Sequence, residues 1–118
     1  MIEITSEQLE ATLREVADER PDYVYMAPAD TDLCSYVHDD GNGVQIPGCI
    51  VGHALFRLGV PLAALSQREG LGAADVIGAT TNLCWSDPAA LAAETAQTAQ
   101  DDGTPWARAM RLAFPEPS

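Results

Sequence analysis

Helix start and stop signals divide this chain into short segments, and they constrain its fold more than any other feature. Thr5, with Gln8 three residues later, has the pattern of a capping box. Asp87-Pro88 and Thr104-Pro105 each place a capping residue before a proline, which is favoured in the first helical turn. Because glycine or proline also marks where these helices stop, the sequence predicts a chain of several separate helices.

The spacing of apolar residues gives the same result in more detail. Leu9, Leu13 and Val16 recur at helical spacing after Thr5, and Arg20-Pro21 ends that helix. Further helices are predicted over 49–58, 61–70, 73–79, 88–102 and 105–113, and short strands over 23–26, 33–38 and 44–46, with a turn at 39–43.

These elements predict a mostly helical α+β fold. It consists of an amino-terminal helix, a small antiparallel β-hairpin or sheet, and then four or five short helices. With 118 residues, the chain is long enough to bury a core without disulfides or metals. We therefore expect one globular domain over 1–118, in which 113–118 form a flexible tail.

The charge of the chain is strongly negative and unevenly divided. The formal net charge is −12, all six basic residues are arginines, and there is no lysine. Residues 1–40 hold eleven acids and two arginines, a net −9, whereas 41–118 hold seven acids and four arginines, a net −3. Such a field repels nucleic acids and membranes and attracts basic partners. The alternative is that the charge only keeps the protein in solution.

Cysteine use and hydropathy predict a reduced, cytoplasmic protein. Three cysteines cannot all pair within one chain, so free or metal-bound thiols are expected. No charged and then apolar leader opens the sequence, and no apolar run approaches the ~18 residues of a membrane span.

Both histidines lie four residues after a cysteine, as Cys34 with His38 and Cys49 with His53. Four such side chains are the ligand set of a tetrahedral zinc site. On a strand, however, Cys34 and His38 would lie about 13 Å apart at ~3.3 Å per residue, so one ion requires a bend near Tyr36. The alternative is that the cysteines are small core residues and the histidines are their polar neighbours.

Cys49 is also a candidate nucleophile, because it follows a Pro-Gly pair at a predicted helix start. The amino-terminal end of a helix lowers the pKa of a thiol. His38 would then act as the base, with Asp39 or Asp40 orienting its ring. The alternative is a buried structural thiol.

Three segments carry a resemblance to a known group of proteins. They are Cys34-Ser-Tyr-Val-His38, the stretch 47–61 (PGCIVGHALFRLGVP) and the stretch 100–109 (QDDGTPWARA). The chain resembles small uncharacterised proteins of actinobacteria and their phages, a group without an assigned activity. The resemblance implies a source but supplies no catalytic residues.

Taken together, these features favour a small acidic accessory or regulatory protein that acts by protein–protein interaction. A partner with a basic surface is expected, direct nucleic-acid binding is not, and catalysis is not the leading hypothesis. A structural zinc protein that uses Cys34, His38, Cys49 and His53, and a Cys49-dependent enzyme, are the two alternatives. The alanine-rich carboxy-terminal half leaves a homodimer open.

Overall fold

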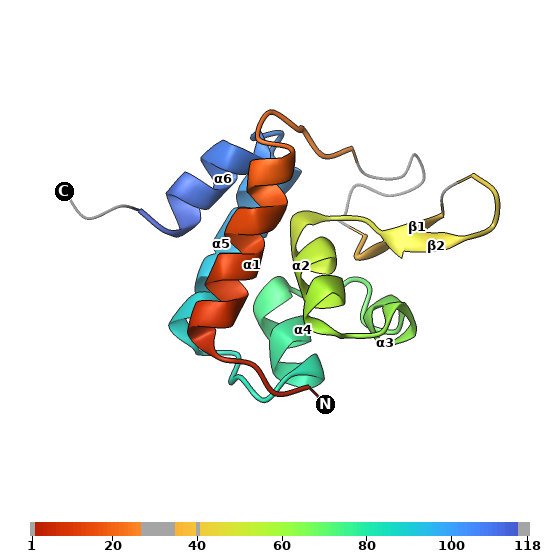
Figure 1. Cartoon of the computed structure of the whole chain (residues 1–118), viewed down its shortest axis with the longest axis horizontal. Helices are drawn as coiled ribbons and strands as arrows, with labels where there is room; N and C mark the ends of the chain where they lie inside the picture. Colours follow the sequence, from red (N-terminus) through yellow and green to blue (C-terminus); the bar gives the residue numbers. More distant parts are fainter. Residues whose placement is uncertain (1, 27–34, 40, 116–118) are drawn as a thin grey trace.

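The computed structural model describes residues 2–26, 35–39 and 41–115, which form six helices and a two-stranded antiparallel sheet (Figure 1). The elements are α1 (Ser6–Glu19), β1 (Val37–Asp39), β2 (Gln45–Pro47), α2 (Ile50–Leu58), α3 (Leu62–Ser66), α4 (Ala73–Thr80), α5 (Pro88–Asp101) and α6 (Trp106–Ala113). The predicted mostly helical α+β fold is confirmed. Within the described ranges, no helix is both long and apolar enough to cross a bilayer.

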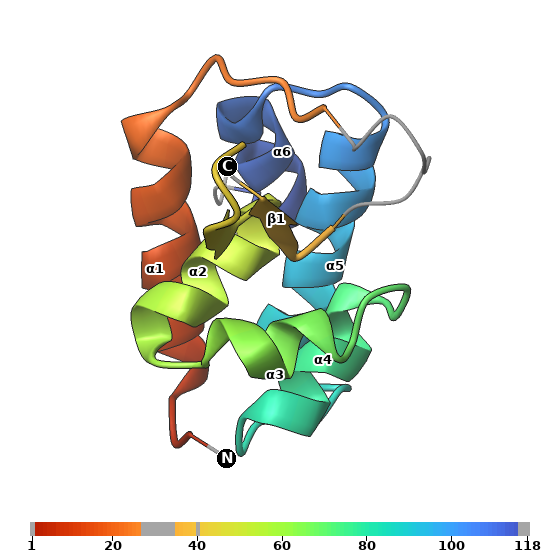
Figure 2. The same cartoon turned by 90° about the vertical axis from the view of Figure 1, so that its right-hand side faces the viewer.

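The core lies where α1, α2 and α5 meet, with α6 packed against α1 and α5 (Figures 1 and 2). The amino-terminal ends of α1 and α5 are joined because Ser6 Oγ donates to both carboxylate oxygens of Asp87, at 2.9 and 2.7 Å. Asp87 also caps α5 by accepting from Ala89 N–H at 2.8 Å. These contacts set α1 and α5 side by side in the same direction.

The local signals for α1 act as predicted. Thr5 Oγ1 accepts from Gln8 N–H at 3.1 Å, and Gln8 Oε1 accepts from Thr5 N–H at 2.8 Å, which completes the capping box. Leu9, Leu13 and Val16 are all buried on the face that meets the other helices. The amphipathic pattern of α1 therefore fixes which side of it remains exposed.

The predicted strand at 23–26 is wrong. Residues 23–26 do not form a strand, and Tyr23 O instead accepts from the backbone N–H of Trp106, at the start of α6, at 3.0 Å. The Tyr23 ring packs edge-on against Trp106, with centroids 4.7 Å apart. Aromatic residues that favour strands are here used to hold a loop against α6.

The hairpin is present but shorter than predicted. β1 and β2 pair antiparallel with His38 opposite Ile46, whereas 33–34 lie outside the described residues and 35–36 are not strand. Asp39 Oδ1 accepts from Gly41 N–H at 2.7 Å and from Gly43 N–H at 3.3 Å. Both glycines have positive φ, so the predicted turn depends on their freedom to adopt that conformation.

Two predictions for the second half of the chain need correction. The helix predicted over 61–70 ends at Ser66. The tail predicted over 113–118 is held at its start, because Ala113 belongs to α6 and Phe114 packs against the core. Phe114 N–H donates to Met110 O at 2.8 Å, and the guanidinium of Arg14 lies over its ring. The Phe114 ring is therefore packed against the domain and does not belong to a free tail.

Candidate functional site

Both histidines line one cavity of about 330 Å³, which lies between the end of α1, the hairpin and α2. Its lining residues are Arg20, Tyr23, His38, Ile46, Pro47, Gly48 and His53. Of the four residues predicted as zinc ligands, Cys34 lies outside the described residues and Cys49 does not line this cavity. The structure therefore joins the two histidines and separates Cys49 from them.

The Cys49 side chain points into the core. Its thiol donates to Gln97 Oε1 at 3.5 Å and accepts from Gly52 N–H at 3.4 Å, so that it caps α2. Among residues 2–26, 35–39 and 41–115, no three His, Cys, Asp or Glu side chains gather as a group that could hold a metal. The four-residue zinc site remains a prediction that gains no support from its three described members.

The geometry also does not assemble the Cys49–His38 pair of the enzyme hypothesis. The predicted helix start is correct, but Cys49 is fully buried. His38 Nε2 lies 2.6 Å from the Tyr25 hydroxyl, and Asp39 accepts from backbone N–H groups of the turn. Asp40, the other proposed orienting residue, lies outside the described residues.

Thiol labelling should distinguish the two described cysteines. In a Cys34→Ser background, we expect Cys84 to react rapidly with a maleimide and Cys49 to react only as the protein unfolds. Cys84 is exposed, and hydrogen bonds to Ser86 lower the pKa of its thiol, whereas Cys49 has no exposed surface. Peptide mapping by mass spectrometry measures both rates. Rapid labelling of Cys49 in the native protein would restore it as a candidate nucleophile.

His53 lies between this cavity and the core. Its ring packs edge-on against the buried Trp106 ring, with centroids 5.5 Å apart. Burial, reinforced by the positive charges of Arg20 and Arg57 and opposed by Glu19, lowers the pKa of His53 from 6.5 to about 4. His53 is therefore a neutral imidazole at neutral pH.

This pKa predicts a pH dependence of stability. The unfolded chain binds a proton at this position more readily than the folded protein does, so stability should fall as the pH falls from 6.5 towards 4. In His53→Gln this contribution is absent, and we expect a shallower decline over the same range. Urea unfolding at a series of pH values tests this, and parallel curves for the two proteins would contradict it.

The acidic surface of α1 is partly neutralised at its carboxy-terminal end. Arg57 of α2 donates to Glu15 at 3.1 Å and also forms a close ion pair with Glu19. Its guanidinium lowers the pKa of the Glu19 carboxyl. The negative charge that sequence reasoning assigned to the amino-terminal third is therefore partly offset here, because one arginine is shared by two of the carboxylates.

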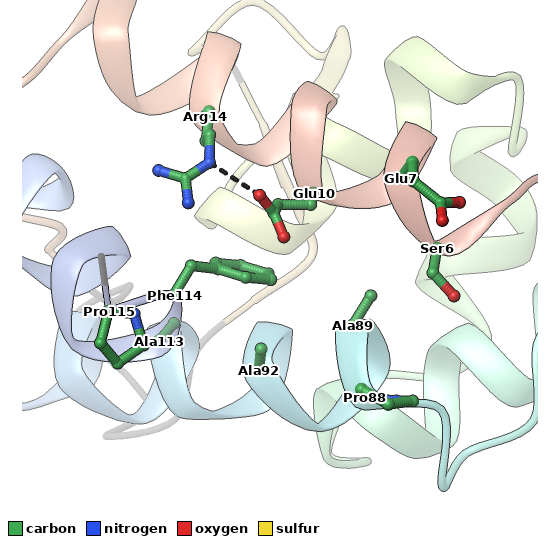
Figure 3. A pocket seen from close by; sticks show the side chains of 10 residues that line it. All are labelled: Ser6, Glu7, Glu10, Arg14, Pro88, Ala89, Ala92, Ala113, Phe114 and Pro115. Atoms are coloured by element: carbon green, nitrogen blue, oxygen red, sulfur yellow. Dashed lines mark hydrogen bonds and ion pairs between the residues drawn. The ribbon is translucent and has the colours of Figure 1, made fainter. Parts of the chain in front are cut away.

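A second cavity, of about 620 Å³, lies along the amino-terminal half of α1 (Figure 3). It is a groove between α1, α5 and the end of α6, lined by Ser6, Glu7, Glu10, Arg14, Pro88, Ala89, Ala92, Ala113, Phe114 and Pro115. We call this cavity the α1–α5 groove. Its α1 wall is polar, and its other residues are mostly apolar.

The α1 wall carries a charge gradient along the groove. Glu7 stands in the first turn of α1, and Glu10 accepts from Arg14 Nε at 3.0 Å one turn further on. The Arg14 guanidinium lies 5.4 Å from the centre of the Phe114 ring, at the end of the groove away from Ser6 and Glu7 (Figure 3). The uncompensated negative charge is therefore at the Glu7 end.

Sequence reasoning missed both the groove and the partners of the histidines. The groove depends on Phe114, which the sequence placed in a tail, and on small residues of α5. The alanines at 89, 92, 93 and 96 recur at helical spacing and were the available signal that α5 approaches its neighbours closely.

No family model matches this chain, and neither the curated proteins nor the solved structures compared with it give a match. Both candidate sites are therefore defined by the geometry of this chain alone.

Proposed function

We propose that the protein is a small acidic accessory or regulatory factor, of actinobacterial or actinophage origin, that binds a basic segment of another protein in the α1–α5 groove. The observation that supports this proposal is the combination of an acidic α1 wall with an apolar floor in one cavity of about 620 Å³. An amphipathic helix with basic residues complements such a surface, because its apolar side fills the floor and its charges meet the wall.

The residues of the floor leave room for a ligand. Ala89 and Ala92 present only methyl groups, and Phe114 supplies a half-buried ring between them and Arg14 (Figure 3). Aliphatic side chains of a partner would bury apolar surface there, at roughly 25 cal/mol per Å² removed from water. The groove therefore offers a source of affinity in addition to charge.

The charge gradient sets the orientation of the partner. A basic residue is favoured near Glu7 and disfavoured near Arg14, so the partner segment should carry its positive charge at one end. Because these carboxylates are accessible to solvent, binding should weaken with salt, which screens charges beyond ~10 Å at 0.1 M.

A pull-down from an actinobacterial lysate tests the proposal when charge-matched variants are compared. We expect a basic partner to be retained at ~0.05 M salt, released at ~0.3 M, and lost in Glu7→Gln/Glu10→Gln. The control is Glu94→Gln/Asp102→Asn, which removes the same two charges from the other side of α5, where both residues line a separate cavity.

Comparing the two double variants shows whether binding depends on the carboxylates of the α1–α5 groove or only on the net charge of the protein. Exposed ion pairs contribute about 0.2–1 kcal/mol, so neither pair of substitutions should unfold the protein, and melting curves check this. Equal loss of the partner from both variants would contradict the proposal, since it would mean that only the net charge matters. Retention by both variants would contradict it as well.

A further inference from the structure

The cavity that joins the two histidines differs in charge from the rest of this acidic molecule. Its described ionisable lining residues are Arg20, Tyr23, His38 and His53, with no carboxylate among them. In a chain with three acids for every arginine, this is an unusual local composition. We propose that this cavity binds a small anionic molecule, one that carries a carboxylate or phosphate group on a flat or apolar body.

Two of the side chains that line this cavity are held in place by the core. Tyr23 and His53 both pack edge-on against Trp106, which is 1% exposed, with centroids 4.7 and 5.5 Å apart. The Arg20 guanidinium lies 5.6 Å from the centre of the Tyr23 ring. Because Tyr23 and His53 are already packed against a buried ring, they lose little conformational entropy on binding, which favours affinity.

His38 is fixed from the other side of the cavity. The Tyr25 hydroxyl lies 2.6 Å from His38 Nε2 and accepts from Ser35 N–H at 3.0 Å. Gly48 makes room for the His38 ring, because a Cβ at position 48 would lie 2.4 Å from His38 Cδ2. The backbone at Gly48 therefore allows the His38 imidazole to lie along the cavity wall.

The chemistry of these groups defines the ligand class. Arg20 supplies a permanent positive charge and a planar set of donors that suits carboxylate and phosphate oxygens. A neutral imidazole offers one N–H donor. Ile46, Pro47 and the ring of Tyr23 supply apolar and aromatic surface for the rest of the molecule. A volume of about 330 Å³ is within the range of pockets that bind small molecules, so it suits a small metabolite.

The composition of the chain makes the test direct, because both of its histidines line this cavity. The imidazole ¹⁵N–¹H correlation spectrum of the labelled protein therefore reports on the cavity alone. Inorganic phosphate and benzoate are titrated separately at constant ionic strength, with chloride as the reference, and His53→Gln assigns the signals. We expect saturable shifts of at least one imidazole with one of the two probes.

Arg20→Gln should weaken the affinity for that probe about tenfold or more, since it removes a charge-assisted hydrogen bond. Arg108→Gln removes an exposed arginine of α6 outside the cavity and should leave the affinity unchanged. Tighter binding of phosphate would indicate a phosphorylated ligand, and tighter binding of benzoate a carboxylate with a ring. Shifts no larger than those with chloride, or equal affinities in the two arginine variants, would overturn the proposal.

Discussion

Replacing Gln100 with leucine is expected to lower the free energy of unfolding by about 3 kcal/mol. Gln100 is fully buried, and its Oε1 accepts from Ile50 N–H at 2.8 Å and from Trp106 Nε1–H at 3.1 Å. This one oxygen therefore satisfies the first turn of α2 and the indole of α6. Leucine has a similar size but no acceptor, so it would leave two buried donors without partners.

Urea unfolding followed by the fluorescence of tryptophan measures this loss. Thr95→Leu is the matched control, because it places the same side chain at an exposed position of the same helix, and it should change stability by less than about 0.5 kcal/mol. If Gln100→Leu were no more destabilising than Thr95→Leu, the proposed junction of α2, α5 and α6 at Gln100 would be wrong.

Gly52→Ala should destabilise the protein by about 2–3 kcal/mol, although alanine is the better helix former by about 1 kcal/mol. Gly52 lies within α2, and a Cβ there would lie 2.4 Å from the backbone oxygen of Tyr36. Neither segment can move easily, since Gly48 N–H donates to the same oxygen at 2.9 Å and Tyr36 is fully buried.

Thermal melting compares this variant with Gly78→Ala in α4. An added Cβ at Gly78 would have its nearest contact at 3.3 Å, so the propensity gain should offset most of the crowding and leave stability nearly unchanged. If Gly52→Ala stabilised the protein, α2 and the chain at Tyr36 would have to lie further apart than the structure places them.

The sequence predicted best those elements whose causes are local. The capping box at Thr5 and the proline after Asp87 specify where α1 and α5 begin, and these starts are correct. The strand predicted at 23–26 failed because its backbone and the Tyr23 ring are engaged by Trp106, far along the chain. Local propensity gives no information about such a distant partner.

Buried glutamines show the same limit. Glutamine is a polar residue that is mostly exposed in proteins, yet Gln97 is 7% exposed and Gln100 is not exposed at all. Gln97 Nε2 donates to the Tyr36 hydroxyl, and Gln100 serves α2 and α6. Gln97 and Gln100 each lie four residues after a buried alanine, Ala93 or Ala96, so they share the buried side of α5. Their position on the helix therefore determines their burial, and the polarity of their side chains does not.

The candidate sites were predicted only in part. The equal Cys-to-His spacings singled out both histidines, and the structure brings them to one cavity. Spacing did not reveal that the Cys49 thiol turns towards Gln97, because the direction of a helix-capping side chain depends on what packs around it. The positions of Arg20 and Tyr23 in the lining of this cavity depend on tertiary contacts and had no sequence signal.

The most direct test of the α1–α5 groove as an interaction surface is photocrosslinking from its floor. A benzophenone amino acid is placed at Ala92 in the groove or at Thr95, which lines the cavity on the other side of α5. We expect a crosslink to one basic protein from position 92, lost at high salt, and none from position 95. A partner that crosslinks equally from both positions, or only from 95, would contradict the proposed interaction surface.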